Sequence, residues 1–130
     1  MSARFDAIGI VVSDMAAAVA FYRLLGLAFP DGAEGEGHVE AGDPGGVRIM
    51  LDTEETMRSF DRSWEAPRDR SRIALAFACS APGEVDRLHG AIVAAGHRSH
   101  LDPFDAFWGQ RYASVLDPDG NVVDLFAPLG

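Results

Sequence analysis

Side chains that could do chemistry fall within apolar runs that have the character of strands. His38 and Glu40 are two residues apart, so a strand places both on one face, where the imidazole can form hydrogen bonds. Tyr112 and Ser114 share this spacing, and Asp124 lies in the next apolar run. In a dry site, burial would raise the pKa of Asp124 and suit it to acid or base catalysis. Asp124 could equally pair with Arg72 across the cleft, as a structural pair or a polar anchor.

Other kinds of chemistry have less support. No Gly-x-Ser-x-Gly motif is present, and the only cysteine, Cys79, excludes an internal disulfide and a cysteine metal site. Strand alternation places Cys79 toward the helices as a core thiol. We expect His89 to lie on the solvent side of a helix, His97 to cap the end of that helix, and His100 to lie beside a strand.

Aromatic residues gather at two places in the chain. Phe104, Phe107 and Trp108 precede a late strand, and Phe60 and Trp64 lie in the central connection. Aromatic walls with a few polar groups are typical of small-molecule sites, and tryptophan stacks well on planar ligands. The alternatives to ligand binding are that Trp108 is a packing residue at the rim of the site, and that Phe104 is an ordinary core residue.

The elements that must position these residues occur twice along the chain. In the first half, the apolar run from Phe5 to Val12 predicts a strand. A helix is expected from Met15 to Leu25, with Asp14 as its N-cap and Gly26 as its end. Two further strands follow at 37–41 and 46–52, joined by a turn at 42–45. The six glycines from Pro30 to Gly46 indicate turns, because no phosphate-binding motif accompanies them.

The second half repeats the order strand, helix, strands. Arg72 to Cys79 reads as a strand, and Ser80 and Pro82 mark the start of a helix. Val85, Leu88 and Ile92 form its apolar stripe, and Gly96 ends it. Strands are expected at 98–104, 110–116 and 121–127. Asp117-Pro118-Asp119-Gly120 predicts a hairpin that pairs Ser114 with Asp124 and Tyr112 with Phe126.

The connection at 53–71 is rich in charge but carries Met57, Phe60 and Trp64. Their spacing fits a short helix over an opening, although these residues could simply pin the connection to the core. We therefore predict one domain, 1–130, with a module at about 1–52, this connection, and a module at about 72–130. The fold class is α+β, with two modules forming a curved mixed sheet around a concave ligand cleft and the helices outside.

Strand alternation indicates which residues line the concave side. Arg72, Ala74, Ala76 and Ala78 share one face, whereas Ile73, Leu75, Phe77 and Cys79 face the helices. Ala7, Gly9 and Val11 form the corresponding set in the first strand. Small residues on this side leave volume for a ligand, unless another backbone approaches closely.

The overall composition narrows the list of partners. Eleven basic against twenty acidic residues give a net charge of −9, which disfavours nucleic acid and anionic membranes. No run is long and apolar enough for a membrane span or a signal peptide, so a cytoplasmic location is expected.

Two segments carry a family resemblance. IGIVVSDMAAAVAFYRLLGL (8–27) and WGQRYASVLDPDGNVVDLFAP (108–128) resemble the vicinal oxygen chelate superfamily, which includes glyoxalase I, extradiol dioxygenases and bleomycin-resistance proteins. The resemblance implies two βαβββ modules forming a deep cleft, most often in a homodimer. It also implies a divalent metal held at four positions, which correspond here to Ala7, Met50, Arg72 and Asp124. Only Asp124 offers a suitable donor, so no metal and no other cofactor is expected.

The function expected from these observations is metal-free binding of a small aromatic molecule. The resemblance is nearest to members that sequester antibiotics such as bleomycin, mitomycin or enediyne-type products. The expected ligand-binding residues are His38, Met50, Phe60, Trp64, Arg72, Phe104, Trp108, Tyr112, Ser114 and Asp124. The alternatives are a metal enzyme with ligands such as His38, His100 and Asp124, a metal-independent isomerase or cyclase, and a structural homodimer.

Overall fold

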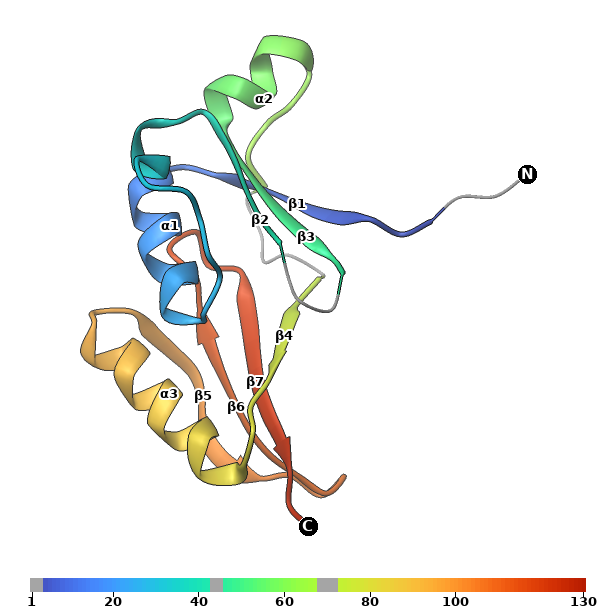
Figure 1. Cartoon of the computed structure of the whole chain (residues 1–130), viewed down its shortest axis with the longest axis vertical. Helices are drawn as coiled ribbons and strands as arrows, with labels where there is room; N and C mark the ends of the chain where they lie inside the picture. The colour runs from blue at the N-terminus through green and yellow to red at the C-terminus, as the bar shows by residue number, and fades with distance from the viewer. Residues whose placement is uncertain (1–3, 43–45, 68–72) are drawn as a thin grey trace. The chain divides into compact units, whose positions relative to one another are not determined.

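The chain folds as two compact units, Met1–Ala66 and Pro67–Gly130 (Figure 1). A computed structural model describes residues 4–42, 46–67 and 73–130. Each unit contains a mixed sheet and a long helix, so the α+β class is confirmed. In the described part of the chain, no helix is long and apolar enough to cross a membrane.

The first unit has a three-stranded sheet in the order β1-β3-β2, in which β1 is parallel and β2 antiparallel to β3. Its elements are β1 (Ala7–Val12), α1 (Met15–Leu24), the 3₁₀ turn η1 (Ala33–Gly35), β2 (His38–Gly42), β3 (Arg48–Thr53) and α2 (Glu54–Phe60).

Local chemistry accounts for the limits of α1. The Asp14 carboxylate accepts a hydrogen bond from the backbone N–H of Ala17 at 3.1 Å, and Gly26 ends the helix with a φ of 91°. Both features were predicted. Strand β1, however, begins at Ala7, and Phe5 is 69% exposed outside the sheet.

The second unit has a four-stranded sheet in the order β4-β7-β6-β5. Its elements are β4 (Leu75–Ala78), α3 (Pro82–Ala94), β5 (Arg98–Asp105), β6 (Gln110–Leu116) and β7 (Val122–Pro128). This order is the full βαβββ pattern. Among the described residues of the first unit, the chain between α1 and β2 contains only η1 (33–35), so that unit has one strand fewer.

The two faces of the second sheet can be assigned from one side chain. Arg111 on β6 donates to the carboxylate of Asp86 on α3 at 2.9 and 2.8 Å, so its side chain faces the helix. The residues that alternate with it on that face are fully buried: Ala113, Val115, Val123, Leu125 and Ala127. Tyr112, Ser114 and Asp124 therefore lie on the face opposite α3.

One predicted exposure is wrong. His89 was expected on the solvent side of its helix, but it is only 8% exposed. It lies four residues after Val85 and three before Ile92, and both are fully buried, so helical spacing places all three on one stripe. Its Nε2 atom lies 2.8 Å from the hydroxyl of Ser99 on β5, which satisfies the buried ring.

Some predicted boundaries also need correction. Strand β4 begins at Leu75, and Ile73, which was expected to face the helices, is 70% exposed before the strand starts. Helix α3 has Pro82 in its first turn as predicted, but the capping position is Ala81, which offers no side-chain hydrogen bond. The centre of the predicted turn at 42–45 lies outside the described residues.

Candidate functional site

Four aromatic rings pack together where β5 meets β6. This aromatic cluster consists of Phe104, Phe107, Trp108 and Tyr112, and Trp108 contacts each of the other three. The centroid of Trp108 lies 6.3 Å from that of Phe104, 5.0 Å from Phe107 and 5.2 Å from Tyr112. All these pairs meet edge to face, the arrangement that the ring quadrupole favours.

A short turn holds the cluster in place. The backbone N–H of Ala106 donates to the carbonyl of Gln110 at 2.8 Å, and that of Gly109 donates to the carbonyl of Ala106 at 3.0 Å. Gly109 has a φ of 90°, a conformation in which a side chain is strained. The indole N–H of Trp108 donates to Oε1 of Gln110 at 2.7 Å and fixes the ring.

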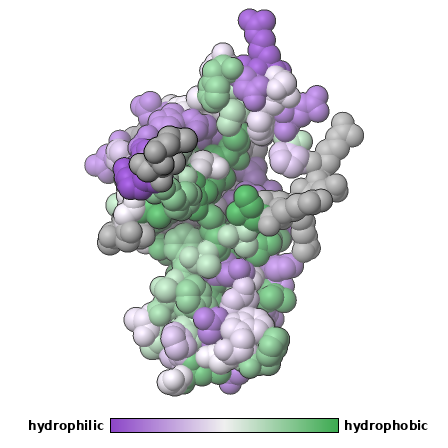
Figure 2. All heavy atoms as spheres, turned by 90° about the vertical axis from the view of Figure 1, so that its right-hand side faces the viewer, coloured by the Kyte–Doolittle hydropathy of each residue, from purple (hydrophilic) through white to green (hydrophobic). Residues whose placement is uncertain are grey.

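The cluster is open to solvent. Phe107 is 97% exposed, Trp108 49% and Phe104 37%, so Phe104 is not an ordinary core residue. In Figure 1, α3 lies to the left of the sheet of the second unit. Figure 2 shows the molecule from the right-hand side of that view, and hydrophobic residues, in green, lie there among pale and hydrophilic ones. An exposed group of large aromatic side chains has the character of a recognition surface.

Polar side chains adjoin the cluster on the face opposite α3. Ser114 pairs with Asp124 and Tyr112 with Phe126 in the β6–β7 hairpin, as predicted. The Ser114 hydroxyl donates to Oδ1 of Asp124 at 2.6 Å and is itself buried. Burial, and then a hydrogen bond to Asp124, raise the pKa of Tyr112 to about 12. The phenol is therefore neutral at physiological pH and acts as a donor.

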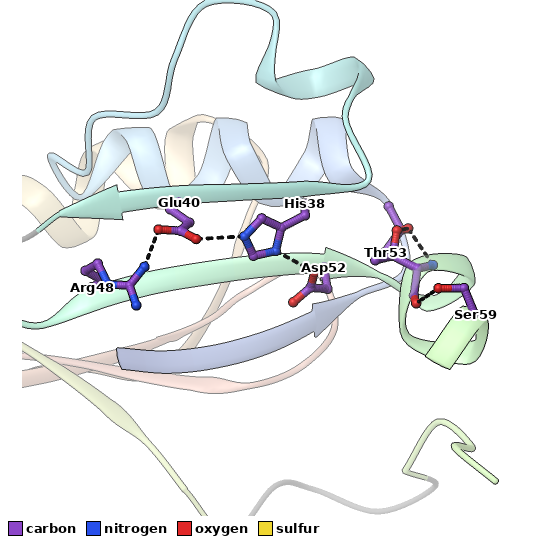
Figure 3. A network of polar contacts seen from close by, with 7 residues as sticks. His38, Glu40, Arg48, Asp52, Thr53 and Ser59 are labelled. Atoms are coloured by element: carbon purple, nitrogen blue, oxygen red, sulfur yellow. Dashed lines mark hydrogen bonds and ion pairs between the residues drawn. The ribbon is translucent and has the colours of Figure 1, made fainter. Parts of the chain in front are cut away.

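A second polar group lies on β2 and β3 of the first unit (Figure 3). His38 is 2.6 Å from Asp52 through Nδ1 and 2.8 Å from Glu40 through Nε2, and Glu40 also binds Arg48. These contacts, with Glu40 foremost, raise the pKa of His38. Carboxylates only accept, so both ring nitrogens donate when the imidazole is protonated. The shared face of His38 and Glu40 was predicted, whereas Asp52 as a partner was missed.

The other predicted residues of the first unit are less engaged. Met50 pairs with Gly9 and Glu40 across the sheet, on the same face as His38. Phe60 ends α2 and is 71% exposed, and no residue of α2 is buried. Trp64 lies beyond the helix, half-buried, with the Arg58 guanidinium 5.1 Å from its ring centre.

The ten predicted residues therefore divide into groups. Within the second unit, the structure brings together Phe104, Trp108, Tyr112, Ser114 and Asp124. Within the first unit, His38 and Met50 share one sheet face, and Phe60 and Trp64 belong to α2 and the chain after it. Arg72 lies outside the described residues, and so does its expected pairing with Asp124.

The donor set does not fit a metal at the positions that the family resemblance implies. Ala7 pairs with Arg48 and offers only a methyl group, and the thioether of Met50 is a poor ligand for hard cations. Asp124 remains as a single carboxylate. Within 4–42, 46–67 and 73–130, no three histidine, cysteine or acidic side chains form a group that could hold a metal ion.

A separate depression of about 340 Å³ adjoins the start of α3. It is lined by Ala78, Cys79, Ser80, Glu84, Arg87 and Leu88, and it includes none of the predicted ligand-binding residues. Burial raises the pKa of Cys79, so the thiol stays protonated, as expected of an unreactive cysteine.

Comparison with known proteins defines the family. Residues 4–125 match the model of the Glyoxalase/Bleomycin resistance protein/Dioxygenase superfamily, and the chain belongs to this superfamily. The resemblance in the two sequence segments is thereby confirmed. No protein with a curated description matches the chain.

Solved structures share the fold. A glyoxalase/bleomycin resistance protein/dioxygenase family enzyme from Burkholderia phytofirmans PsJN is 23% identical, with a TM-score of 0.79 over 98% of this chain and 100% of its own. A glyoxalase-related enzyme from Fulvimarina pelagi is 21% identical, with a TM-score of 0.81 over 95% and 87%. A glyoxalase/bleomycin resistance protein/dioxygenase from Nocardioides is 24% identical, with a TM-score of 0.76 over 99% and 85%. At these identities the likeness concerns the fold.

Proposed function

We propose that this protein binds and sequesters a small aromatic molecule at the aromatic cluster, without a metal ion. The observation that carries the proposal is the placement of four exposed or half-buried rings beside the Ser114–Asp124 pair. Small-molecule sites typically combine aromatic surface with a few polar groups that orient the ligand. Each edge-to-face or stacked ring contact contributes about 0.5–1.5 kcal/mol beyond the area that it buries.

Two features favour binding over catalysis. The positions at which the superfamily would hold a metal carry Ala7 and Met50, which cannot replace charged ligands. Asp124 already accepts a hydrogen bond from the Ser114 hydroxyl, an arrangement that suits a polar anchor. The proposal also includes the homodimer that the resemblance implies. Light scattering of the purified protein would measure the oligomeric state.

The proposal can be tested with protein purified in the presence of a chelator. The backbone amide resonances, which the native protein and its variants share, would be followed while bleomycin, mitomycin and other aromatic natural products are added; in the native protein the indole N–H resonance of Trp108 reports on the cluster itself. We expect saturable shifts, and a Trp108→Ala variant with affinity lower by about tenfold, or about 1.4 kcal/mol. Phe5→Ala is a matched control, because Phe5 is also an exposed aromatic residue but lies outside the cluster.

Three results would contradict the proposal. One is unchanged affinity in Trp108→Ala. Another is binding that appears only after a divalent metal is restored. The third is recovery of the added compound in a chemically altered form, which would favour an enzyme.

A further inference from the structure

We propose that His38 acts as a proton-dependent clamp, which fastens the start of β2 to β3 when its ring is protonated and loosens that end of the strand when the proton leaves. Strand β2 lies at an edge of the sheet order β1-β3-β2, so its pairing with β3 holds it to that sheet. The clamp lies in the first unit and makes no use of the aromatic cluster. Its failure would therefore leave the proposed function untouched.

The contacts of the ring require a proton on both nitrogens. Nδ1 of His38 lies 2.6 Å from Oδ1 of Asp52, and Nε2 lies 2.8 Å from Oε2 of Glu40 (Figure 3). Ionised carboxylates only accept hydrogen bonds, and a neutral imidazole has a single N–H. A neutral ring would therefore direct a lone pair at one of the two carboxylates, whereas the protonated ring donates to both.

The two carboxylates come from different strands. Glu40 lies on β2 itself, two residues after His38, whereas Asp52 is the cross-strand partner of His38 on β3. The side chain of Asp52 is only 16% exposed, so the nearby positive charge is screened less by water than at a fully solvated carboxylate. The contact between His38 and Asp52 is thus the part of the clamp that joins the two strands.

Arg48 holds the Glu40 carboxylate beside the ring. It lies on β3 and binds both Glu40 and Asp6, the residue before β1. The hydrogen bond from Arg48 lowers the pKa of Asp6, and hydrogen bonds with His38 and then Arg48 lower the pKa of Glu40, so both carboxylates are ionised at neutral pH. Arginine keeps its charge at every accessible pH. The group in this network that titrates near neutrality is therefore His38.

Helix α2 is the other element beside this end of β2. It meets β2 at Gly37 through Thr56, whose hydroxyl is neutral. The backbone N–H of Thr53 donates to the carbonyl of Gly37 at 2.9 Å, next to the clamp. The proton on His38 therefore controls the end of β2 that adjoins the helix.

The direction of the pH dependence follows from the partners of the ring. The hydrogen bond to Glu40, and then the hydrogen bond to Asp52, raise the pKa of His38 above its ordinary value of about 6.5. The stabilisation of β2 is therefore fully present below about pH 6.5 and is lost as the pH rises through the raised pKa. Above that pKa, the ring donates one hydrogen bond in place of two.

Two magnetic resonance measurements on the full chain test the clamp. The histidine ring resonances would be followed from about pH 5 to about pH 9, and His38→Gln identifies the signal of His38. Hydrogen exchange of the backbone amides would then be measured about one pH unit below and above the His38 midpoint, with the intrinsic effect of pH removed. We expect a midpoint above about 6.5. Protection of the β2 amides should fall about threefold at the higher pH, the size of an exposed ion pair, and that of the β6 amides should not.

Variants assign the effect to the clamp. Asp52→Asn removes the negative charge on β3 and should lower the His38 midpoint. Asp31→Asn is the matched control, because it makes the same change in net charge at an exposed residue of the first unit, and it should keep the midpoint. In His38→Gln, protection of β2 should no longer depend on pH. The His38 side chain is 44% exposed, so this variant should fold, and it provides the test if Asp52→Asn does not fold.

Several results would overturn the clamp. One is a His38 midpoint at or below about 6.5. Another is an unchanged midpoint in folded Asp52→Asn. The clamp is also wrong if protection of β2 follows that of β6 at both pH values, or if His38→Gln keeps the pH dependence of the native protein.

Discussion

The phenol of Tyr112 is the residue whose ionisation reports most directly on the site. Burial and the hydrogen bond to Asp124 raise its pKa to about 12, compared with about 10 for a free tyrosine. A raised pKa means that the folded state holds the proton more tightly than the unfolded state. The resulting stabilisation is fully present below about pH 10 and is lost as the pH rises toward 12.

A spectroscopic titration would check this prediction. The near-ultraviolet absorbance of tyrosinate should contain a step near pH 12 that is absent from Tyr112→Phe. Asp124→Asn should move that step to lower pH, because the carboxylate is one cause of the shift. A step that stays in place in Asp124→Asn would show that burial alone holds the proton.

Single residues show where sequence reasoning reaches its limit. The shared face of His38 and Glu40 follows from a spacing of two, and the structure confirms it. Asp52 lies fourteen positions away, so only the pairing of β2 with β3 brings it to the His38 ring. The burial of His89 was already indicated by its spacing from Val85 and Ile92, whereas its partner Ser99 depends on how β5 packs.

At the scale of the element, Gly37 determines how closely β2 approaches α2. A Cβ atom at Gly37 would lie 2.5 Å from Oγ1 of Thr56, which accepts a hydrogen bond from the Thr53 hydroxyl. Gly37→Ala should therefore lower the free energy of unfolding by about 1 kcal/mol, because the cost of overpacking exceeds the gain from a stiffer unfolded chain.

A double-mutant cycle in urea would test this contact. Thr56→Ala removes the clashing oxygen and leaves Thr53 as the helix cap, so Gly37→Ala should cost much less in that background. Gly35→Ala is the matched control, since a Cβ at Gly35 meets no atom within 4 Å. Equal costs of Gly37→Ala in both backgrounds would rule out the contact.

Most elements were predictable because their signals are local. The Asp14 cap, the positive-φ glycines and the hairpin at 117–120 act within a few residues, and α1, β6 and β7 follow closely. The start of β4 was placed too early, because hydrophobicity alone does not show where pairing with β7 begins. The spacing of Met57, Phe60 and Trp64 predicted a helix, but α2 ends at Phe60.

At the scale of the whole molecule, the negative charge should make ligand binding depend on salt. The Debye length falls from about 20 Å at about 20 mM salt to about 4 Å at about 500 mM. Over that range the affinity for a cationic aromatic probe, 1-methylquinolinium, should fall several-fold, because the field of the protein is screened. The affinity for 2-methylquinoline, a probe of similar shape that is neutral at pH 8, should not fall.

Calorimetric titrations at the two salt concentrations would measure the difference. If the affinity for the cationic probe stays constant, the net charge of −9 has no part in its binding.

The repeated order of strand, helix and strands made the α+β class predictable for the whole chain. The aromatic cluster was only partly predictable. Phe104, Phe107 and Trp108 are near one another in sequence, but the contact with Tyr112 requires the register of β5 against β6, which contains irregularities. Arg72 remains a predicted ligand-binding residue.

The turn between β5 and β6 has a consequence for how this protein can diverge. Its framework consists of backbone hydrogen bonds between Ala106, Gly109 and Gln110, and neither the Phe107 side chain nor the Trp108 ring takes part in them. Exchanges at these two positions can therefore change the exposed aromatic surface while the hairpin is inherited intact. Single codon changes in descendants of this sequence can thus reshape that surface while the backbone hydrogen bonds of the turn are kept.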